Sequence, residues 1–222
     1  KNPEHKWLVV CPLILIENAW LPDAAKFLPD VKIVNCHAAT KIKRVKAMQQ
    51  EANIYVTNTE SFVSYSDHFN DMGFTGCFVD ESSDMKSTKS KISHCLVDLA
   101  QAIFDISMTI PRWYNLSATP APNGEHEYFM QMRSIDYYSM PSSYAQFKEY
   151  YFVNLSYNPQ YEKLSLRPDK KEEFFSTIKA HAIYVDKEDV LETPGRDFFE
   201  VPFDLPADLK KHYTKLKNDM AL

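Results

Sequence analysis

Two adjacent carboxylates, Asp80 and Glu81, directly follow an apolar run from Phe74 to Val79. The run predicts a buried β-strand, and neighbouring strand residues point to opposite sides, so the two carboxylates would take different roles. An aspartate at a strand end can hold a magnesium-bound water near nucleotide phosphates, and the next glutamate can polarise the attacking water. The alternative interpretation is that Asp80 caps the following helix and Glu81 is solvated.

Small hydroxyl residues end a second expected strand, which begins at Arg112. Ser117 and Thr119 precede a stiff turn from Pro120 to Asn123. Hydroxyls at this position can bond to the acidic pair on a neighbouring strand and sense a γ-phosphate, and the turn can pass that signal outward. A plain strand followed by a proline-rich turn is the alternative.

Strands and helices must alternate to position these residues. The expected strands are residues 7–12, 31–34, 54–58, 73–79 and 112–117, and the expected helices are residues 13–27, 41–51, 62–69 and 91–104. This alternation predicts right-handed βαβ units and a mostly parallel sheet, with ligands bound outside the carboxyl ends of the strands. Both groups of candidate residues lie at that edge.

The pattern changes after the second strand end. Aromatic residues dominate to Tyr161, helices are expected over 171–182 and 208–220, and a last strand is expected over 198–201. We therefore predict an α/β domain over residues 1–136 and an aromatic-rich, α-helical extension over 137–222. Core packing is the preferred role for the tyrosine-rich stretch, and stacking on bases is the alternative.

Composition limits the function classes. The net charge of −5 over 222 residues argues against a generic nucleic-acid binder. The four glycines nearly exclude glycine-rich phosphate loops, and no Gly-Lys-Thr or Gly-Lys-Ser occurs. The four cysteines form no Cys-x-x-Cys pair, which favours reduced core residues of an intracellular protein. No apolar stretch approaches membrane-spanning length.

Basic residues form two local clusters, which are Lys41, Lys43, Arg44 and Lys46, and Lys86, Lys89 and Lys91. A phosphate track and solvated helix faces are both open interpretations of these clusters.

Four stretches in order resemble motifs of the first RecA-like lobe of superfamily-two helicase-like ATPases, most closely the Swi/Snf-type DNA translocases and their phage-encoded branch. They are Leu8–Leu13 with Asn18–Trp20 (motif Ia), Ile54–Ser61 (motif Ib), Val79–Ser83 with Lys86 (the Asp-Glu-x-His box) and Leu116–Gly124 (motif III). The Thr-Pro-x-x-Asn form of motif III is the most family-specific element. The box lacks its usual histidine, and Ser83 is the expected substitute in the contact with motif III.

The resemblance implies an α/β fold: a RecA-like (P-loop NTPase) parallel sheet flanked by helices. It implies ATP and Mg²⁺ as cofactors, and double-stranded DNA and a second RecA-like lobe of the same protein as partners. It assigns Asp80 to the metal, Glu81 to water activation, and Ser117 and Thr119 to coupling at the nucleotide. The residues implied near DNA are Pro12, Leu13, Asn18, Thr57, Asn58, Ser61 and Asn123.

The phosphate-binding loop of the family normally lies shortly before the strand at Trp7, and neither it nor the second lobe with its arginine finger is present. The resemblance therefore implies the N-terminal lobe of an ATP-dependent DNA translocase, inactive as this fragment, in the cytoplasm of a bacterium or a phage-infected host cell. The alternative is a catalytically incomplete adaptor or inhibitor that binds another protein. An unrelated α/β hydrolase using Asp80 would lack a recognisable nucleophile elbow.

Overall fold

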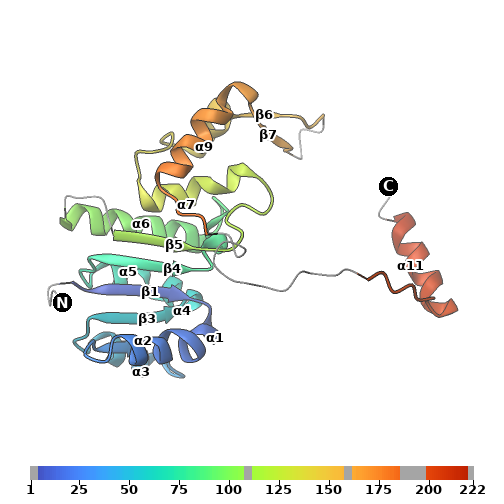
Figure 1. Cartoon of the computed structure of the whole chain (residues 1–222). Helices are drawn as coiled ribbons and strands as arrows, with labels where there is room; N and C mark the ends of the chain where they lie inside the picture. Colours follow the sequence, from blue (N-terminus) through green and yellow to red (C-terminus); the bar gives the residue numbers. More distant parts are fainter. Residues whose placement is uncertain (1–4, 108–111, 158–161, 186–198, 220–222) are drawn as a thin grey trace. The chain divides into compact units, whose positions relative to one another are not determined.

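Five parallel strands form the central sheet, in the order β2-β3-β1-β4-β5 (Figure 1). They are β1 (Trp7–Cys11), β2 (Ile33–Asn35), β3 (Ile54–Asn58), β4 (Gly76–Asp80) and β5 (Arg112–Leu116). In the register, Cys11 pairs with Asn58 and Asp80 pairs with Leu116, so these carboxyl ends meet at one edge. The parallel sheet predicted from the alternation of elements is confirmed.

The computed structural model describes residues 5–107, 112–157, 162–185 and 199–219. The chain divides into two compact units, Lys1–Ala182 and Ile183–Leu222. The sheet and the candidate site belong to the first unit.

Helices connect successive strands of the sheet. They are α1 (Leu13–Leu15), the π-helix η1 (Ile16–Trp20), α2 (Leu21–Phe27), α3 (Lys41–Met48), α4 (Thr59–Ser64), α5 (Ser66–Asn70), the 3₁₀ turn η2 (Ser82–Met85) and α6 (Lys91–Ser107). The single helix expected over 62–69 is two helices, because the backbone leaves the helical region at Tyr65, where φ is −127° and ψ is 24°. The strand expected from residue 73 begins at Gly76, because Gly73 adopts a left-handed turn with φ of 68°.

Apolar residues alternate between the two faces of the sheet. One face packs against α4, α5 and α6, and its buried strand residues are Leu8, Val10, Tyr55, Cys77, Val79 and Trp113. The other face carries a smaller core in which Val9, Cys11 and Val56 pack with Ile16. Strands covered on both faces are expected to be almost continuously apolar, as β1 is.

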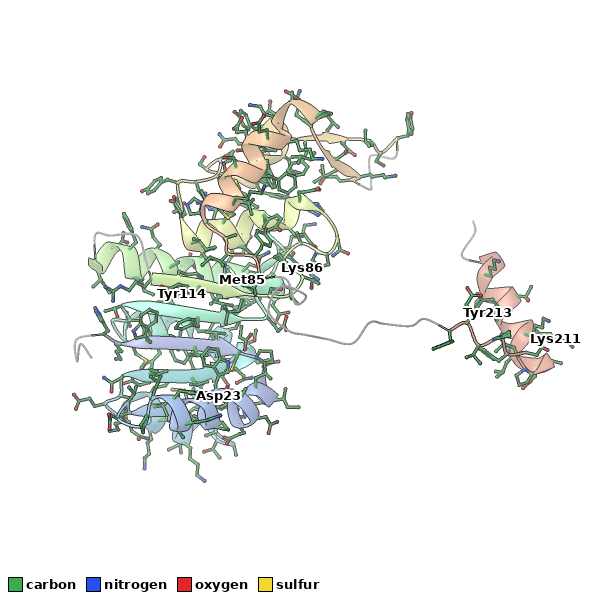
Figure 2. All side chains as sticks on the ribbon, in the orientation of Figure 1. Asp23, Met85, Lys86, Tyr114, Lys211 and Tyr213 are labelled. Carbon is green, nitrogen blue, oxygen red and sulfur yellow. The ribbon has the colours of Figure 1, made fainter. Side chains whose placement is uncertain are left out.

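An aromatic row crosses the second face towards the outer strand β5. The ring centroids of Trp7 and Phe78 are 5.3 Å apart, and those of Phe78 and Tyr114 are 4.9 Å apart. Gly76 permits this close approach, because a Cβ atom there would lie 2.4 Å from Trp7 Cζ3 and 2.8 Å from the Arg112 carbonyl oxygen. Tyr114 remains 48% exposed on β5 (Figure 2).

A second core follows the sheet in sequence. Its elements are η3 (Glu125–Glu127), α7 (Tyr128–Ile135), α8 (Tyr144–Tyr151), β6 (Phe152–Asn154), β7 (Leu164–Leu166), η4 (Pro168–Lys170) and α9 (Lys171–Ala180). Phe147 is fully buried among other rings, including Phe129 and Phe174, at centroid distances of 5.0 and 6.2 Å. The predicted core packing of the aromatic stretch is confirmed for Phe147, Tyr151 and Phe152, which are buried. It is wrong for Tyr138, Tyr150 and Tyr157, which are exposed, and Tyr161 lies outside the described residues. The antiparallel pair of β6 and β7 was not predicted.

The second unit contains the helix α11 (Ala207–Asp219), which confirms the helix expected near the end of the chain. The strand expected over 198–201 is wrong for residues 199–201, which have no regular secondary structure, and Phe198 lies outside the described residues. Phe199 and Val201 are 84% and 80% exposed, and no described strand pairs with them. None of the helices within the described ranges is long and apolar enough to cross a membrane.

Candidate functional site

Asp80 is the last residue of β4, and an aromatic donor orients its carboxylate. The indole Nε1 of Trp20 donates to Asp80 Oδ2 at 2.9 Å, and the backbone N–H of Glu81 donates to Asp80 Oδ1 at 3.1 Å. Trp20 also packs against Phe78, with ring centroids 5.9 Å apart. The turn η2 has no side-chain cap, so Asp80 does not serve as a helix cap. Its carboxylate is half-buried and held in one orientation at the sheet edge.

Glu81 has a left-handed backbone, with φ of 56° and ψ of 52°. It is the one non-glycine residue with positive φ among those that the structure describes. This conformation costs an L-residue about 1–2 kcal/mol, and such outliers concentrate where function requires the backbone geometry. The Glu81 side chain is exposed. The left-handed turn therefore places the exposed Glu81 side chain directly after the oriented Asp80.

An uncharged thiol lies at the carboxyl end of the neighbouring strand β1. Cys11 is fully buried at the end of β1, and its Sγ contacts the Thr57 carbonyl oxygen at 3.9 Å. Burial raises the pKa of the Cys11 thiol to about 12, and the negative charge of Asp80 adds to the shift. The thiol is therefore neutral at physiological pH and brings no competing charge to the site.

The turn after Glu81 runs into η2 and then to Lys86. Ser82 and Met85 are buried, whereas Lys86 is exposed beside them (Figure 2). Ser82 Oγ donates to Gln131 Oε1 on α7 at 3.0 Å. The direct contact with motif III that was expected from Ser83 is not seen, since Ser83 makes no side-chain hydrogen bond in the described part of the chain and the neighbouring Ser82 bonds to Gln131, outside motif III.

The hydroxyl residues after β5 stabilise their own turn. Ser117 Oγ accepts from the backbone N–H of Thr119 at 3.1 Å, and Thr119 is exposed. Within the residues described, neither hydroxyl bonds to the acidic pair. The next turn is fixed by Asn123, whose Nδ2 and backbone N–H donate to the two carboxylate oxygens of Glu127 at 2.8 and 3.1 Å.

The residues implied near DNA fall into an accessible group and a buried group. Leu13, Asn18 and Asn123 are exposed, and Pro12 is half-buried. The other three, Thr57, Asn58 and Ser61, are at most 3% exposed.

Asn58, the last residue of β3, and Ser61 hold a histidine that sequence reasoning missed. His37 Nδ1 lies 2.9 Å from Asn58 Oδ1 and 3.4 Å from Ser61 Oγ. The Asn58 amide also donates to the Glu60 carboxylate. The one signal in the sequence was the position of His37 two residues after a strand, at the same edge as the other candidates.

The single oriented carboxylate of Asp80 suits a metal ion that is also bound by nucleotide phosphates. Among the described residues, no group of three or more His, Cys, Asp and Glu side chains could hold a metal ion. Mg²⁺ usually keeps several waters and binds through one or two carboxylates together with nucleotide phosphates. Asp80, fixed by Trp20, fits that mode.

Comparisons with known proteins identify the family and the fold of this chain. A family model described as "SNF2-related domain" matches residues 1–184. The Sulfolobus solfataricus SWI2/SNF2 ATPase core in complex with dsDNA superposes with a TM-score of 0.61 at 19% identity, covering 81% of this chain and 33% of that chain. The S. solfataricus SWI2/SNF2 ATPase core domain superposes with a TM-score of 0.57 at 18% identity, covering 87% of this chain and 36% of that chain.

These likenesses show a RecA-like sheet flanked by helices, as the sequence predicted. The chain spans about a third of the length of the solved structures that it matches. No curated protein sequence matches it.

Proposed function

We propose that this chain, which belongs to the SNF2-related domain family, is the N-terminal lobe of an ATP-dependent translocase acting on double-stranded DNA. The observation that carries the proposal is the pair Asp80 and Glu81 at the carboxyl edge of β4. One carboxylate of this pair is oriented by Trp20, and the other is exposed on a left-handed turn. A carboxylate pair in this arrangement supports phosphoryl transfer to water.

The two carboxylates divide the chemistry. Asp80 would hold Mg²⁺ through its free lone pairs or a bound water, and Mg²⁺ would neutralise the charge that develops on the phosphates. Glu81 would accept a proton from the attacking water, for which its exposed carboxylate is accessible. Ser117 and Thr119 would act as the coupling residues beside the nucleotide, through the turn that they stabilise.

Efficient turnover would need groups that this sequence does not contain. It has no Gly-Lys-Thr or Gly-Lys-Ser to cradle phosphates. Electrostatic stabilisation of the phosphates dominates phosphoryl-transfer catalysis. A phosphate loop and a second lobe with an arginine finger would therefore come from elsewhere in a longer protein. The second candidate function is an incomplete module that binds another protein.

Duplex DNA would lie along the same edge of the sheet. Leu13, Asn18, Pro122 and Asn123 are exposed there, and strand-end backbone amides suit contacts with phosphates. The side chains of Asn58 and Ser61 would act indirectly, by holding His37 at the surface. The phage-encoded branch and a cytoplasmic location remain part of this proposal and depend on the motif resemblance.

Replacement of Trp20 by phenylalanine tests the proposed function at its metal ligand. Trp20→Phe removes the 2.9 Å hydrogen bond to Asp80 but keeps a ring against Phe78. A hydrogen bond to a charged group contributes about 1.5–3 kcal/mol, so we expect the catalytic efficiency with MgATP to fall about tenfold or more. The measurement is a Mg²⁺ titration of ATP hydrolysis by the full-length protein.

Trp7→Phe is the matched control, because Trp7 stacks on Phe78 at 5.3 Å without a hydrogen bond to Asp80. Equal losses in the two variants would contradict the role of Trp20. Absence of Mg²⁺-dependent hydrolysis in the unmodified protein would contradict the proposed function itself and favour the binding module.

A further inference from the structure

A buried amide connects the acidic turn after β4 with the turn after β5. The Gln131 side chain accepts a hydrogen bond from Ser82 Oγ at 3.0 Å. Its Nε2 donates to the carbonyl oxygen of Pro120 at 2.6 Å and to that of Glu127 at 3.2 Å. Ser82 directly follows Glu81, and Pro120 begins the turn that contains Asn123. The Gln131 side chain therefore contacts both Ser82, which is next to the proposed catalytic base, and Pro120, which begins the motif III turn.

Burial makes these contacts specific. Gln131 is 4% exposed, Ser82 is 1% exposed and Glu127 is 5% exposed. Both donors and the acceptor of the Gln131 amide are used by these contacts. A buried polar group that loses its partner costs about 1–3 kcal/mol, so displacement of either turn alone is unfavourable.

The α7 helix that carries Gln131 is itself attached to β5. Asn115 Nδ2 donates to the Gln131 carbonyl oxygen at 3.2 Å and to Ser134 Oγ at 3.1 Å. Ser134 Oγ in turn donates to the Gln131 carbonyl oxygen at 2.7 Å. These bonds fix the backbone of Gln131 on β5. Its side chain bonds to the two turns.

We propose that Gln131 is a positioning residue that couples the Asp80–Glu81 turn to the motif III turn, in the place of the histidine that the acidic box lacks. A shift of the Pro120 carbonyl moves the Gln131 amide, which moves Ser82 and therefore the backbone of Glu81. DNA engaged at the 120–123 turn thus changes the position of the water-activating carboxylate. This inference rests on the proposed function and assigns a residue outside the motifs to its regulation.

A double-mutant cycle in the full-length protein tests this coupling. Ser82→Ala and Gln131→Met each remove the 3.0 Å bond, and methionine keeps the length of the glutamine side chain. Each variant is expected to lower the DNA-stimulated kcat about tenfold, with little change in the KM for ATP. Because both changes break one link, the double variant should lose no more than Gln131→Met alone.

Ser134→Ala is the matched control, since Ser134 is buried in the same helix and bonds to neither turn, and Asn115 still donates to the Gln131 carbonyl oxygen without it. It should lower the melting temperature and leave DNA stimulation unchanged. Multiplicative losses in the double variant, or an equal loss of stimulation in Ser134→Ala, would overturn the coupling while leaving the proposed function intact. An unmodified protein without ATP hydrolysis would overturn the proposed function, and the coupling with it.

Discussion

Glu81→Gln is expected to lower DNA-stimulated ATP hydrolysis by about 10²–10⁴-fold, the range typical for loss of a general base. Glutamine keeps the shape of glutamate but cannot accept the proton of the attacking water at neutral pH. The exposed side chain of Glu81 makes no hydrogen bond through its carboxylate in the described structure, so the fold should be unaffected. Steady-state hydrolysis by the full-length protein measures this effect.

Nucleotide binding should survive the same substitution, because the proposed metal ligand is Asp80, whose contact with Trp20 is unchanged. Asp84→Asn is the matched control, since Asp84 is another exposed carboxylate in the same turn. It should retain nearly full turnover. Unchanged turnover in Glu81→Gln, or an equal loss in Asp84→Asn, would remove the assigned role of Glu81.

Asn123→Ala is expected to abolish most of the stimulation by DNA while the basal rate of ATP hydrolysis persists. The Asn123 side chain donates at 2.8 Å to Glu127, a carboxylate that is only 5% exposed. Removal of a donor from a buried charged group costs about 1–3 kcal/mol, which should loosen the turn from Pro120 to Asn123. The ratio of DNA-stimulated to basal hydrolysis is the quantity to measure.

Pro122→Ala provides the comparison, because Pro122 is exposed in the same turn and donates no hydrogen bond. A large loss of the ratio in Asn123→Ala with a small loss in Pro122→Ala would support a coupling role. Full stimulation in Asn123→Ala would contradict it.

The sheet could be predicted because its signals are local. Strands β1, β3 and β4 are short apolar runs, and the α6 helix shows regular apolar spacing, so the order of elements is visible along the chain. The paired strands β6 and β7 are three residues each and have no such signal. The strand expected over 198–201 had the right residue types but has no described partner strand, and a strand needs one.

The position of Asp80 and Glu81 could be predicted because parallel strands bring their carboxyl ends to one edge. Two other side chains could not be predicted: the one that orients Asp80 and the one that we propose couples the acidic turn to the motif III turn. Trp20 lies 60 residues before Asp80, and Gln131 lies 49 residues after Ser82. Such contacts depend on how the helices pack on the sheet, and a single sequence carries no pattern that pairs a distant indole or amide with an acidic turn.

ATP hydrolysis by the full-length protein, measured with and without duplex DNA in the presence of Mg²⁺, tests the central claim most directly. The proposed role of Asp80 and Glu81 predicts Mg²⁺-dependent turnover that duplex DNA stimulates, with the stimulation weakened by salt as phosphate contacts are screened. The absence of turnover under all these conditions would contradict it and would favour a module that binds another protein.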